Sequence, residues 1–316
     1  MRTSSRSSQS GVMRPSSVSS PHGEEDRIMR WRTVIASLTA TFAIAALCEG
    51  QAGVVNVGDA RIHFERAGTG APLVLIHGWA NDLRTWEDQF SAFARDFQVV
   101  RYDRRGFGRS TSVGDLTADP TDLAALLDTL GITSAHVVGH SAGARVALAF
   151  ALAFPGRVRG LVLYSSGPPV GFPMTADAAA FADLPALARR VGLDSLGKLV
   201  MSMPAFFIPP DRDEVRQRVA AMWSAYSGRD VLEDHRPAGT TPLATLDALA
   251  RIRVPTLVVV GETDGAFFHQ IADSLVARIP GARRATVQGG GHVVHMLAPA
   301  QFNEVVVAFL RSAGPR

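Results

Sequence analysis

The stretch that decides the fold is Gly139-His140-Ser141-Ala142-Gly143, a G-x-S-x-G pentapeptide. The apolar run 135–138 precedes it, and residues 144–154 follow without a helix-breaking residue. This context predicts a strand, a tight turn and a helix, with Ser141 exposed on the turn. Gly139 and Gly143 suit such a turn because a Cβ at either position would collide where the strand and helix backbones pass close together. The pentapeptide in this context predicts a nucleophilic serine.

A candidate acid and a candidate base follow farther along the chain. The run 255–261 is continuously apolar, as is typical of a buried parallel strand, and Asp264 lies just beyond its carboxyl end. A short strand is expected at 284–287, followed by a glycine-rich loop that presents His292. The chain order Ser141, Asp264, His292 matches one of the common serine-triad arrangements. Glu262 is the rival acid, and Asp264 has a structural alternative as the cap of the helix expected at 266–277.

An oxyanion site is expected beside the serine. Attack on a carbonyl develops negative charge, and preorganised N–H donors must stabilise it. The backbone N–H groups of Trp79 and Ala142 are the candidates, because Trp79 follows His77-Gly78 after the apolar run 73–76 and Ala142 follows the nucleophile.

Together these motifs resemble those of the α/β-hydrolase family over roughly residues 54–311. Residues 102–110, YDRRGFGRS, are similar to the family's D-x-R-G-x-G-x-S segment, and Trp86 falls where the preceding helix usually carries a tryptophan. The family pattern G-H-x-x-x-x-E-x-P has Leu297 in place of its acid, which is not a triad member. The resemblance implies an α/β fold with a mostly parallel eight-stranded sheet flanked by helices and an inserted helical cap.

The position of the cap follows from chain length between strands. About ninety residues separate Tyr164 from Thr256, whereas a plain crossover needs about a dozen. The surplus, residues 168–242, is the predicted cap, and 53–167 with 243–316 form the predicted core. Glycine and proline residues, which interrupt helices, separate three segments of the cap. Helices are therefore predicted at 176–191, 195–203 and 212–227.

The candidate substrate-binding residues come from both parts. The core supplies Trp79 and His140, although His77 and His140 also suit a role in orienting loops. The cap carries many aromatic residues and methionines, of which four are the candidates: Phe206, Phe207, Met222 and Trp223. Such a roof favours apolar acyl or alcohol groups over charged polymers.

Other polar residues near the motifs have structural expectations. His295 is three residues from His292, so it is expected to form a pocket wall or to support the base. Asp103 and Arg105 are expected to form a structural pair.

The first fifty residues differ in composition from the rest. Residues 1–28 are rich in serine, arginine and proline, which predicts disorder or an extension ahead of a start at Met29. Residues 29–52 combine a basic segment, a fifteen-residue apolar run at 33–47 and a small-x-small site ending at Ala52, as in a secretory signal peptide. Cleavage there would remove the single cysteine, Cys48, and export to the periplasm or medium is the predicted location. An N-terminal membrane anchor is the alternative.

Composition and charge give little support for several classes of binding partner. The chain is 47% hydrophobic with a net charge of +3, and its arginines are dispersed, which gives little support for nucleic-acid binding. Gly106-Phe107-Gly108 lacks the third glycine of a dinucleotide fingerprint, and no metal or cofactor is expected.

These observations favour a serine hydrolase of small to medium, largely apolar carboxylic esters that acts through an acyl-enzyme. Hydrolysis of a lactone or enol-lactone, carbon–carbon bond hydrolysis, proline-releasing aminopeptidase activity and cofactor-free perhydrolysis remain as alternatives on the same apparatus. A non-catalytic ligand receptor is the alternative from another class. Neither the natural substrate nor the oligomeric state follows from the sequence.

Overall fold

The computed structural model describes residues 50–173, 184–206, 208–233 and 239–313. They lie within one compact unit, Leu47–Arg316. The disordered extension expected at 1–28 and nearly all of the expected leader at 29–52 lie outside the described residues. None of the helices in the described ranges is long and apolar enough to cross a membrane.

The described residues form one eight-stranded sheet in the order β1-β2-β4-β3-β5-β6-β7-β8. Only β2 runs antiparallel to its neighbours, and the other pairings are parallel. The strands are β1 (Gln51–Val57), β2 (Ala60–Ala67), β3 (Ala71–Ile76), β4 (Phe97–Tyr102), β5 (Ala135–His140), β6 (Val158–Tyr164), β7 (Thr256–Gly261) and β8 (Arg283–Val287). The expected fold class is therefore confirmed.

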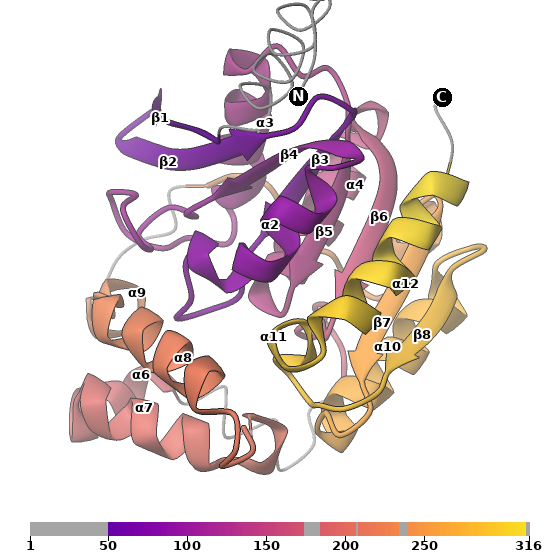
Figure 1. The fold of residues 1–316 in the computed structure, drawn as a ribbon. Coiled ribbons are helices and arrows are strands. Elements are labelled where there is room, and N and C mark those ends of the chain that lie inside the picture. Colours follow the sequence, from indigo (N-terminus) through magenta and orange to yellow (C-terminus); the bar gives the residue numbers. More distant parts are fainter. Residues whose placement is uncertain (1–49, 174–183, 207, 234–238, 314–316) are drawn as a thin grey trace, which may run out of the picture. The chain divides into compact units, whose positions relative to one another are not determined.

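Helices cover both faces of this sheet (Figure 1). The core helices are α2 (Glu87–Phe93), α3 (Asp119–Thr129), α4 (Ala142–Ala153), α10 (Ala266–Arg278), α11 (Val294–Leu297) and α12 (Pro299–Ser312), with short 3₁₀ turns η1 (Leu83–Trp86), η2 (Pro155–Arg157) and η4 (Asp247–Arg251). Side chains of α3, α4 and α10 form one buried cluster with the sheet, and those of α2 and α12 form a second. Burial on both faces explains why β5 and β7 are buried along their whole length and show no alternation.

A helical insertion follows β6. Its described elements are α6 (Leu184–Val191), α7 (Leu193–Ser202), η3 (Pro204–Phe206), α8 (Asp213–Ala225) and α9 (Arg229–Leu232). The expected helices at 195–203 and 212–227 correspond to α7 and α8, whereas of the helix expected at 176–191 only α6 lies within the described residues.

Two apolar clusters pack the insertion against the core. In one, Leu196 and Tyr226 of the insertion join Phe107 of the core. In the other, Met222 of α8 joins Val293 and Met296. Apolar contact with the core therefore fixes the insertion at both of its sides.

The loop after β4 differs from expectation, because Asp103 and Arg105 do not pair with each other. The buried Asp103 accepts hydrogen bonds from the backbone N–H groups of Leu83 and Arg109, each at 2.8 Å. Arg105 instead pairs with the carboxylates of Asp122 at 2.8 Å and Asp59 at 2.5 Å. The two side chains therefore each find partners outside this segment of the loop.

Candidate active site

Ser141 occupies a strained turn between β5 and α4, with a φ of 54° and a ψ of −115°. Few residues with a side chain adopt such a conformation, and it persists only where the surroundings hold it. Its backbone N–H donates to the carbonyl of Tyr164 at 2.9 Å, and its own carbonyl accepts from Gly167 at 3.1 Å. Both contacts come from the end of β6 and the loop after it, which fix the turn.

The flanking glycines are required by space. A Cβ on Gly139 would lie 2.4 Å from the carbonyl oxygen of Gly143, and one on Gly143 would lie 2.4 Å from the carbonyl oxygen of Ile76. Both distances are well inside contact range with backbone atoms that cannot move independently. The pentapeptide therefore forms the tight elbow expected from its sequence.

The structure brings Asp264 and His292 together beyond the carboxyl ends of β7 and β8. His292 Nδ1 lies 3.4 Å from Asp264 Oδ1, and both side chains are almost fully buried. The other carboxylate oxygen, Oδ2, accepts a 2.6 Å hydrogen bond from Ser165 Oγ. This distance is longer than that of a well-formed hydrogen bond, and Nδ1 has no other partner among the described residues.

The rival acid lies elsewhere. Glu262 is exposed, and its carboxylate accepts a 3.4 Å hydrogen bond from the backbone N–H of Gly289. Because Asp264 is buried against the imidazole and Glu262 is not, the geometry favours Asp264 as the acid.

Aromatic rings surround the His292 imidazole. The ring centroids of Phe268, Phe206 and His140 lie 4.3, 4.7 and 4.8 Å from that of His292. Phe206 belongs to the insertion, so both parts of the chain limit the rotation of this ring.

His140 and Tyr164 hold the loop that carries His292. The carbonyl oxygen of His292 accepts from Tyr164 Oη at 2.5 Å and from His140 Nε2 at 2.9 Å. The rings of His140 and Tyr164 stack at 4.6 Å. Burial keeps the pKa of His140 well below its usual value, so the imidazole stays neutral.

His295 supports this arrangement from beneath. Its Nδ1 lies 3.3 Å from Tyr164 Oη, and its Nε2 lies 3.0 Å from Thr85 Oγ1. Complete burial lowers the pKa of His295 to about 3. His295 therefore supports the loop that carries His292, which is one of the two roles that the sequence suggested for it.

The two expected oxyanion donors lie beside the elbow. Ala142 is the first residue of α4, so its N–H has no acceptor within the helix. The Trp79 N–H has no acceptor in the part of the chain that the structure describes. A Cβ on Gly78 would approach Ser141 Cβ to 3.2 Å, so the loop after β3 passes close to the nucleophile.

His77 fixes that loop from below. Its Nε2 accepts from the backbone N–H of Arg104 at 2.9 Å, and its Nδ1 lies 2.7 Å from the Gly78 carbonyl. Burial lowers its pKa to about 3, and the charge of Arg104 adds to that effect. The neutral ring orients the loop, as expected from the sequence.

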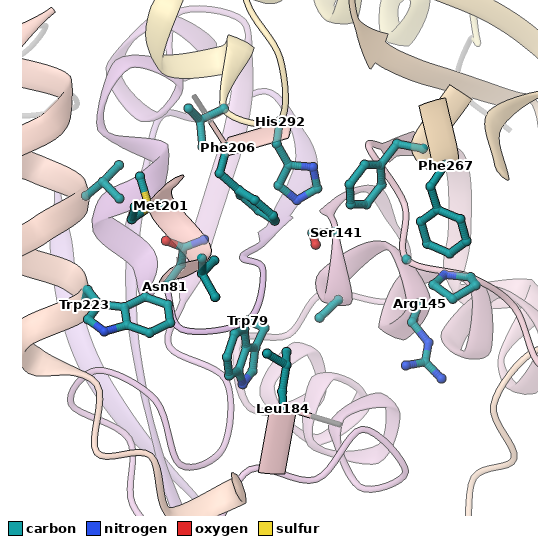
Figure 2. Close-up of a pocket in the computed structure, with 17 residues that line it drawn as sticks. Trp79, Asn81, Ser141, Arg145, Leu184, Met201, Phe206, Trp223, Phe267 and His292 are labelled. Carbon is teal, nitrogen blue, oxygen red and sulfur yellow. The ribbon is translucent and has the colours of Figure 1, made fainter. Parts of the chain in front are cut away.

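A cavity of about 190 Å³ opens between Ser141, His292 and the insertion (Figure 2). Three of the candidate substrate-binding residues, Trp79, Phe206 and Trp223, line it. Its lining residues are Trp79, Asn81, Ser141, Ala142, Arg145, Gly167, Pro168, Leu184, Val200, Met201, Phe206, Val219, Trp223, Phe267, Phe268, His292 and Val293.

Two of the expected substrate-binding residues are not among the described lining residues. His140 lies behind the elbow, 1% exposed, where it holds the His292 loop. Met222 is 2% exposed and points from α8 into the cluster with Val293 and Met296. Its neighbour Trp223 faces the cavity instead, because consecutive helical residues point about 100° apart. Phe207 lies outside the described residues.

Sequence reasoning missed several lining residues. Arg145 is four residues after Ser141 on α4, and this spacing placed it on the same helical face. Phe267 and Phe268 open α10 just after Asp264, so their position next to the acid was also readable. Leu184, Val200 and Val219 carried no such signal, since they reach the cavity only through the packing of the insertion.

Within the described ranges, no cluster of three or more histidine, cysteine, aspartate or glutamate side chains could hold a metal ion.

Comparison with known proteins places this geometry among hydrolases. The chain is 30% identical over 266 residues to the "Putative carbamate hydrolase RutD" of Azorhizobium caulinodans, which covers 80% of this chain and 96% of that protein. It is 33% identical over 275 residues to a 2-hydroxy-6-oxononadienedioate/2-hydroxy-6-oxononatrienedioate hydrolase of Burkholderia vietnamiensis, with 80% and 92% covered.

A solved structure and a family model match the same part of the chain. Est816, described as an N-acyl homoserine lactone degrading enzyme, superposes with a TM-score of 0.69 at 27% identity and covers 81% of this chain and all of that one. The model of the family described as the alpha/beta hydrolase fold matches residues 71–299, which span the elbow, the acid, the imidazole and the insertion. The chain is therefore a member of the α/β-hydrolase fold family.

Proposed function

We propose that this hydrolase cleaves carboxylic esters of small to medium, largely apolar substrates, with Ser141 as nucleophile, His292 as base and Asp264 as the acid that orients it. The observation that carries the proposal is the position of Ser141. It lies on a strained elbow that opens into an apolar cavity, with His292 in the same lining and Asp264 buried behind His292.

The reaction would proceed through an acyl-enzyme. His292 Nε2 takes the proton of the Ser141 hydroxyl as the oxygen attacks the carbonyl carbon. The N–H groups of Trp79 and Ala142 stabilise the negative oxygen of the tetrahedral intermediate. The protonated imidazole then gives its proton to the departing alcohol, and the same imidazole activates the water that releases the acid. Asp264 holds Nδ1 and stabilises the transient positive charge.

The cavity supports the proposed substrate class. Its volume of about 190 Å³ is below the 300–1,000 Å³ typical of sites for drug-sized ligands, which favours small to medium esters. Most of its walls are aliphatic or aromatic side chains, which bind apolar acyl or alcohol groups through burial.

The alternatives use the same apparatus. Similar proteins carry names that refer to carbamate, dienedioate and homoserine lactone chemistry, so the scaffold alone does not choose the bond. Lactone or enol-lactone hydrolysis, carbon–carbon bond hydrolysis, proline-releasing aminopeptidase activity and perhydrolysis are the competing activities. A ligand receptor would bind without turnover.

A substrate panel tests the proposal. Purified protein is assayed with p-nitrophenyl esters of graded chain length, lactones, a vinylogous 1,5-diketone and aminoacyl amides, with the Ser141→Ala variant as blank. The proposal expects the highest kcat/KM among the esters. A higher value for another class would replace the ester assignment, and binding without turnover of any class would favour the receptor.

We also propose that the protein is exported and that residues 29–52 are a cleaved signal peptide. Gln51 and Ala52 of the edge strand β1 pair with Arg66 and Glu65 of β2. Cleavage after Ala52 would therefore shorten β1 by two residues. Expressed with its own leader in a bacterium, the protein is expected in the periplasm or medium with Gly53 near its N-terminus. Intact mass of full-length chain in the cytosol would contradict export, and full-length chain in the membrane fraction would favour the anchor.

A further inference from the structure

Buried arginines in the core are matched with carboxylates. Arg101 pairs with Glu65 at 2.6 Å and Glu87 at 2.8 Å. Arg104 pairs with Asp119 at 2.6 Å, and Arg105 has two carboxylate partners of its own. This matching is expected, because a charge taken out of water costs several kcal/mol unless an opposite charge compensates it.

Arg145 departs from this pattern. It lines the active-site cavity, is only partly exposed, and has no hydrogen bond or ion pair to any described residue. Burial lowers the pKa of its guanidinium, and the charge of Arg104 lowers it further. A guanidinium nevertheless stays charged at neutral pH. The cavity therefore contains a cation whose counter-ion the described chain does not supply.

The side chain is held at this place. A Cβ on Gly167 would lie 2.9 Å from Arg145 Cδ, so the aliphatic stem packs closely over the Gly167 backbone. Figure 2 shows Arg145 and His292 on opposite sides of Ser141 in this view. An acyl or alcohol group that extends from Ser141 away from His292 in this view would pass towards Arg145.

Arg145 also differs in charge from the other residues that line the cavity. Apart from Arg145 and His292, the described lining residues carry no ionisable side chain. An apolar cavity with one fixed cation matches a ligand with an apolar body and one anionic end. Guanidinium and carboxylate are complementary in shape, and the pair forms two parallel hydrogen bonds.

We propose that Arg145 is a specificity residue that binds a carboxylate carried by the substrate, remote from the scissile bond, so that the preferred substrates are monoanionic esters with an otherwise apolar body. This inference rests on the proposed ester hydrolysis and narrows its substrate class. The carboxylate takes no part in bond breaking. Its pairing with Arg145 compensates the buried charge when the ester is bound.

Matched ester pairs test the inference. The first pair is p-nitrophenyl hydrogen adipate and its amide, p-nitrophenyl adipamate, which differ only in the charge at the acyl end. The second pair is 3-carboxyphenyl butyrate and 3-carbamoylphenyl butyrate, which differ at the alcohol end. The measured quantity is the ratio of kcat/KM for acid over amide within each protein, so a general loss of activity in a variant cancels.

Wild-type protein is expected to prefer the acid about 10- to 100-fold in at least one pair, as a charge-assisted hydrogen bond would give. Arg145→Gln should reduce that ratio to about one or below, and Arg145→Lys should retain part of it because the charge remains. Arg159→Gln is the matched control. Arg159 bonds Ser134 near the amino end of β6, away from the site, and its variant should keep the wild-type ratio.

Binding supplies a second readout that needs no turnover. In the Ser141→Ala protein, hexanoate should bind more tightly than hexanamide by calorimetry, and the Arg145→Gln substitution in that background should remove the difference.

The outcomes separate the two proposals. Hydrolysis of both amide esters with no acid preference in either pair, or a preference that survives Arg145→Gln, would overturn the role of Arg145 and leave ester hydrolysis standing. Selective binding of hexanoate without hydrolysis of any ester would overturn ester hydrolysis while supporting the anion site.

Discussion

The two walls of the cavity are built differently. On the core wall, Ser141, His292 and the Trp79 backbone lie just past the carboxyl ends of parallel strands, and hydrogen bonds or backbone contacts fix each one. On the insertion wall, Leu184, Val200 and Val219 contribute apolar surface. The core wall therefore holds the groups that can carry out the reaction, whereas the insertion wall holds groups that can select its substrate.

The side chain of Trp79 on the core wall contacts the insertion directly. Trp79 Nε1 donates to Asp230 of α9 at 2.9 Å, and the Trp79 ring makes edge contacts with Trp223 and Tyr226 at 5.5 and 5.6 Å. Trp79, whose backbone N–H is a candidate oxyanion donor, thus carries a side chain that packs on the insertion. Loss of the reacting groups on the core wall should abolish activity, whereas changes at Arg145 or on the insertion wall should redirect it.

The largest expected effect is that of Ser141→Ala. Removal of the nucleophile should lower kcat by several orders of magnitude, on the order of 10⁴-fold or more, because triad members act as a unit. Steady-state kinetics on the best ester, with circular dichroism to confirm folding, measures it. Retention of more than about a tenth of the rate would show that another group performs the attack.

A smaller loss is expected for Asp264→Asn. The amide should leave His292 in the wrong tautomer and cost about 10²- to 10⁴-fold in kcat. Glu262→Gln is the control, since the Glu262 carboxylate is exposed and accepts from the backbone N–H of Gly289 rather than contacting His292. If Glu262→Gln were the more damaging change, the acid assignment would be wrong.

The burial of His295 behind the core wall should change how the free energy of unfolding depends on pH. Burial holds the folded pKa of His295 at about 3, below an unfolded value near 6.5, so the unfolded state binds more protons between these pH values. The buried His295 therefore lowers the free energy of unfolding as pH falls from about 6.5 towards 3. The loss is about 2 kcal/mol at pH 5.

Urea unfolding at pH 7 and pH 5 measures the effect. Asp103 and Asp119, whose pKa values burial raises to about 6, act in the opposite direction, so the comparison must be between wild type and His295→Gln. The variant should lose less stability between the two pH values than wild type. Equal losses would mean that His295 is not held neutral by its surroundings.

The smallest expected effect concerns the insertion wall. Trp223→Ala or Phe206→Ala should shift the preferred acyl chain length, with kcat/KM ratios between neighbouring lengths changing about three- to tenfold, because a methylene contact discriminates by about 1 to 3 kcal/mol. Met222→Ala is the matched control on the same helix. It should cost about 2 to 5 kcal/mol of stability and leave the chain-length profile in place. An unchanged profile in both cavity variants would mean that the insertion does not select the acyl group.

The contrast between the walls also describes what sequence reasoning could reach. The elbow, the buried strand that ends before Asp264 and the contact of Asp264 with His292 all follow from the sequence, because each depends on a few consecutive residues at the end of a buried strand. The insertion was anticipated from the surplus of residues between Tyr164 and Thr256, and its helices from glycine and proline positions. Met222 was assigned to the cavity because apolar residues of the insertion look alike in sequence, whichever face they occupy.

The sequence by itself determined the backbone features of this protein: where the strands end, which glycines permit the tight turns and where a serine must adopt a positive φ. These depend on local sterics, which a short stretch of residues encodes. Only the tertiary structure decided that Trp223 rather than Met222 faces the cavity, that His140 holds the His292 loop from behind, and that Arg145 lines the site with no carboxylate partner among the described residues. These depend on which distant segments meet, and such contacts arise from packing the insertion against the core, a property that no local pattern records.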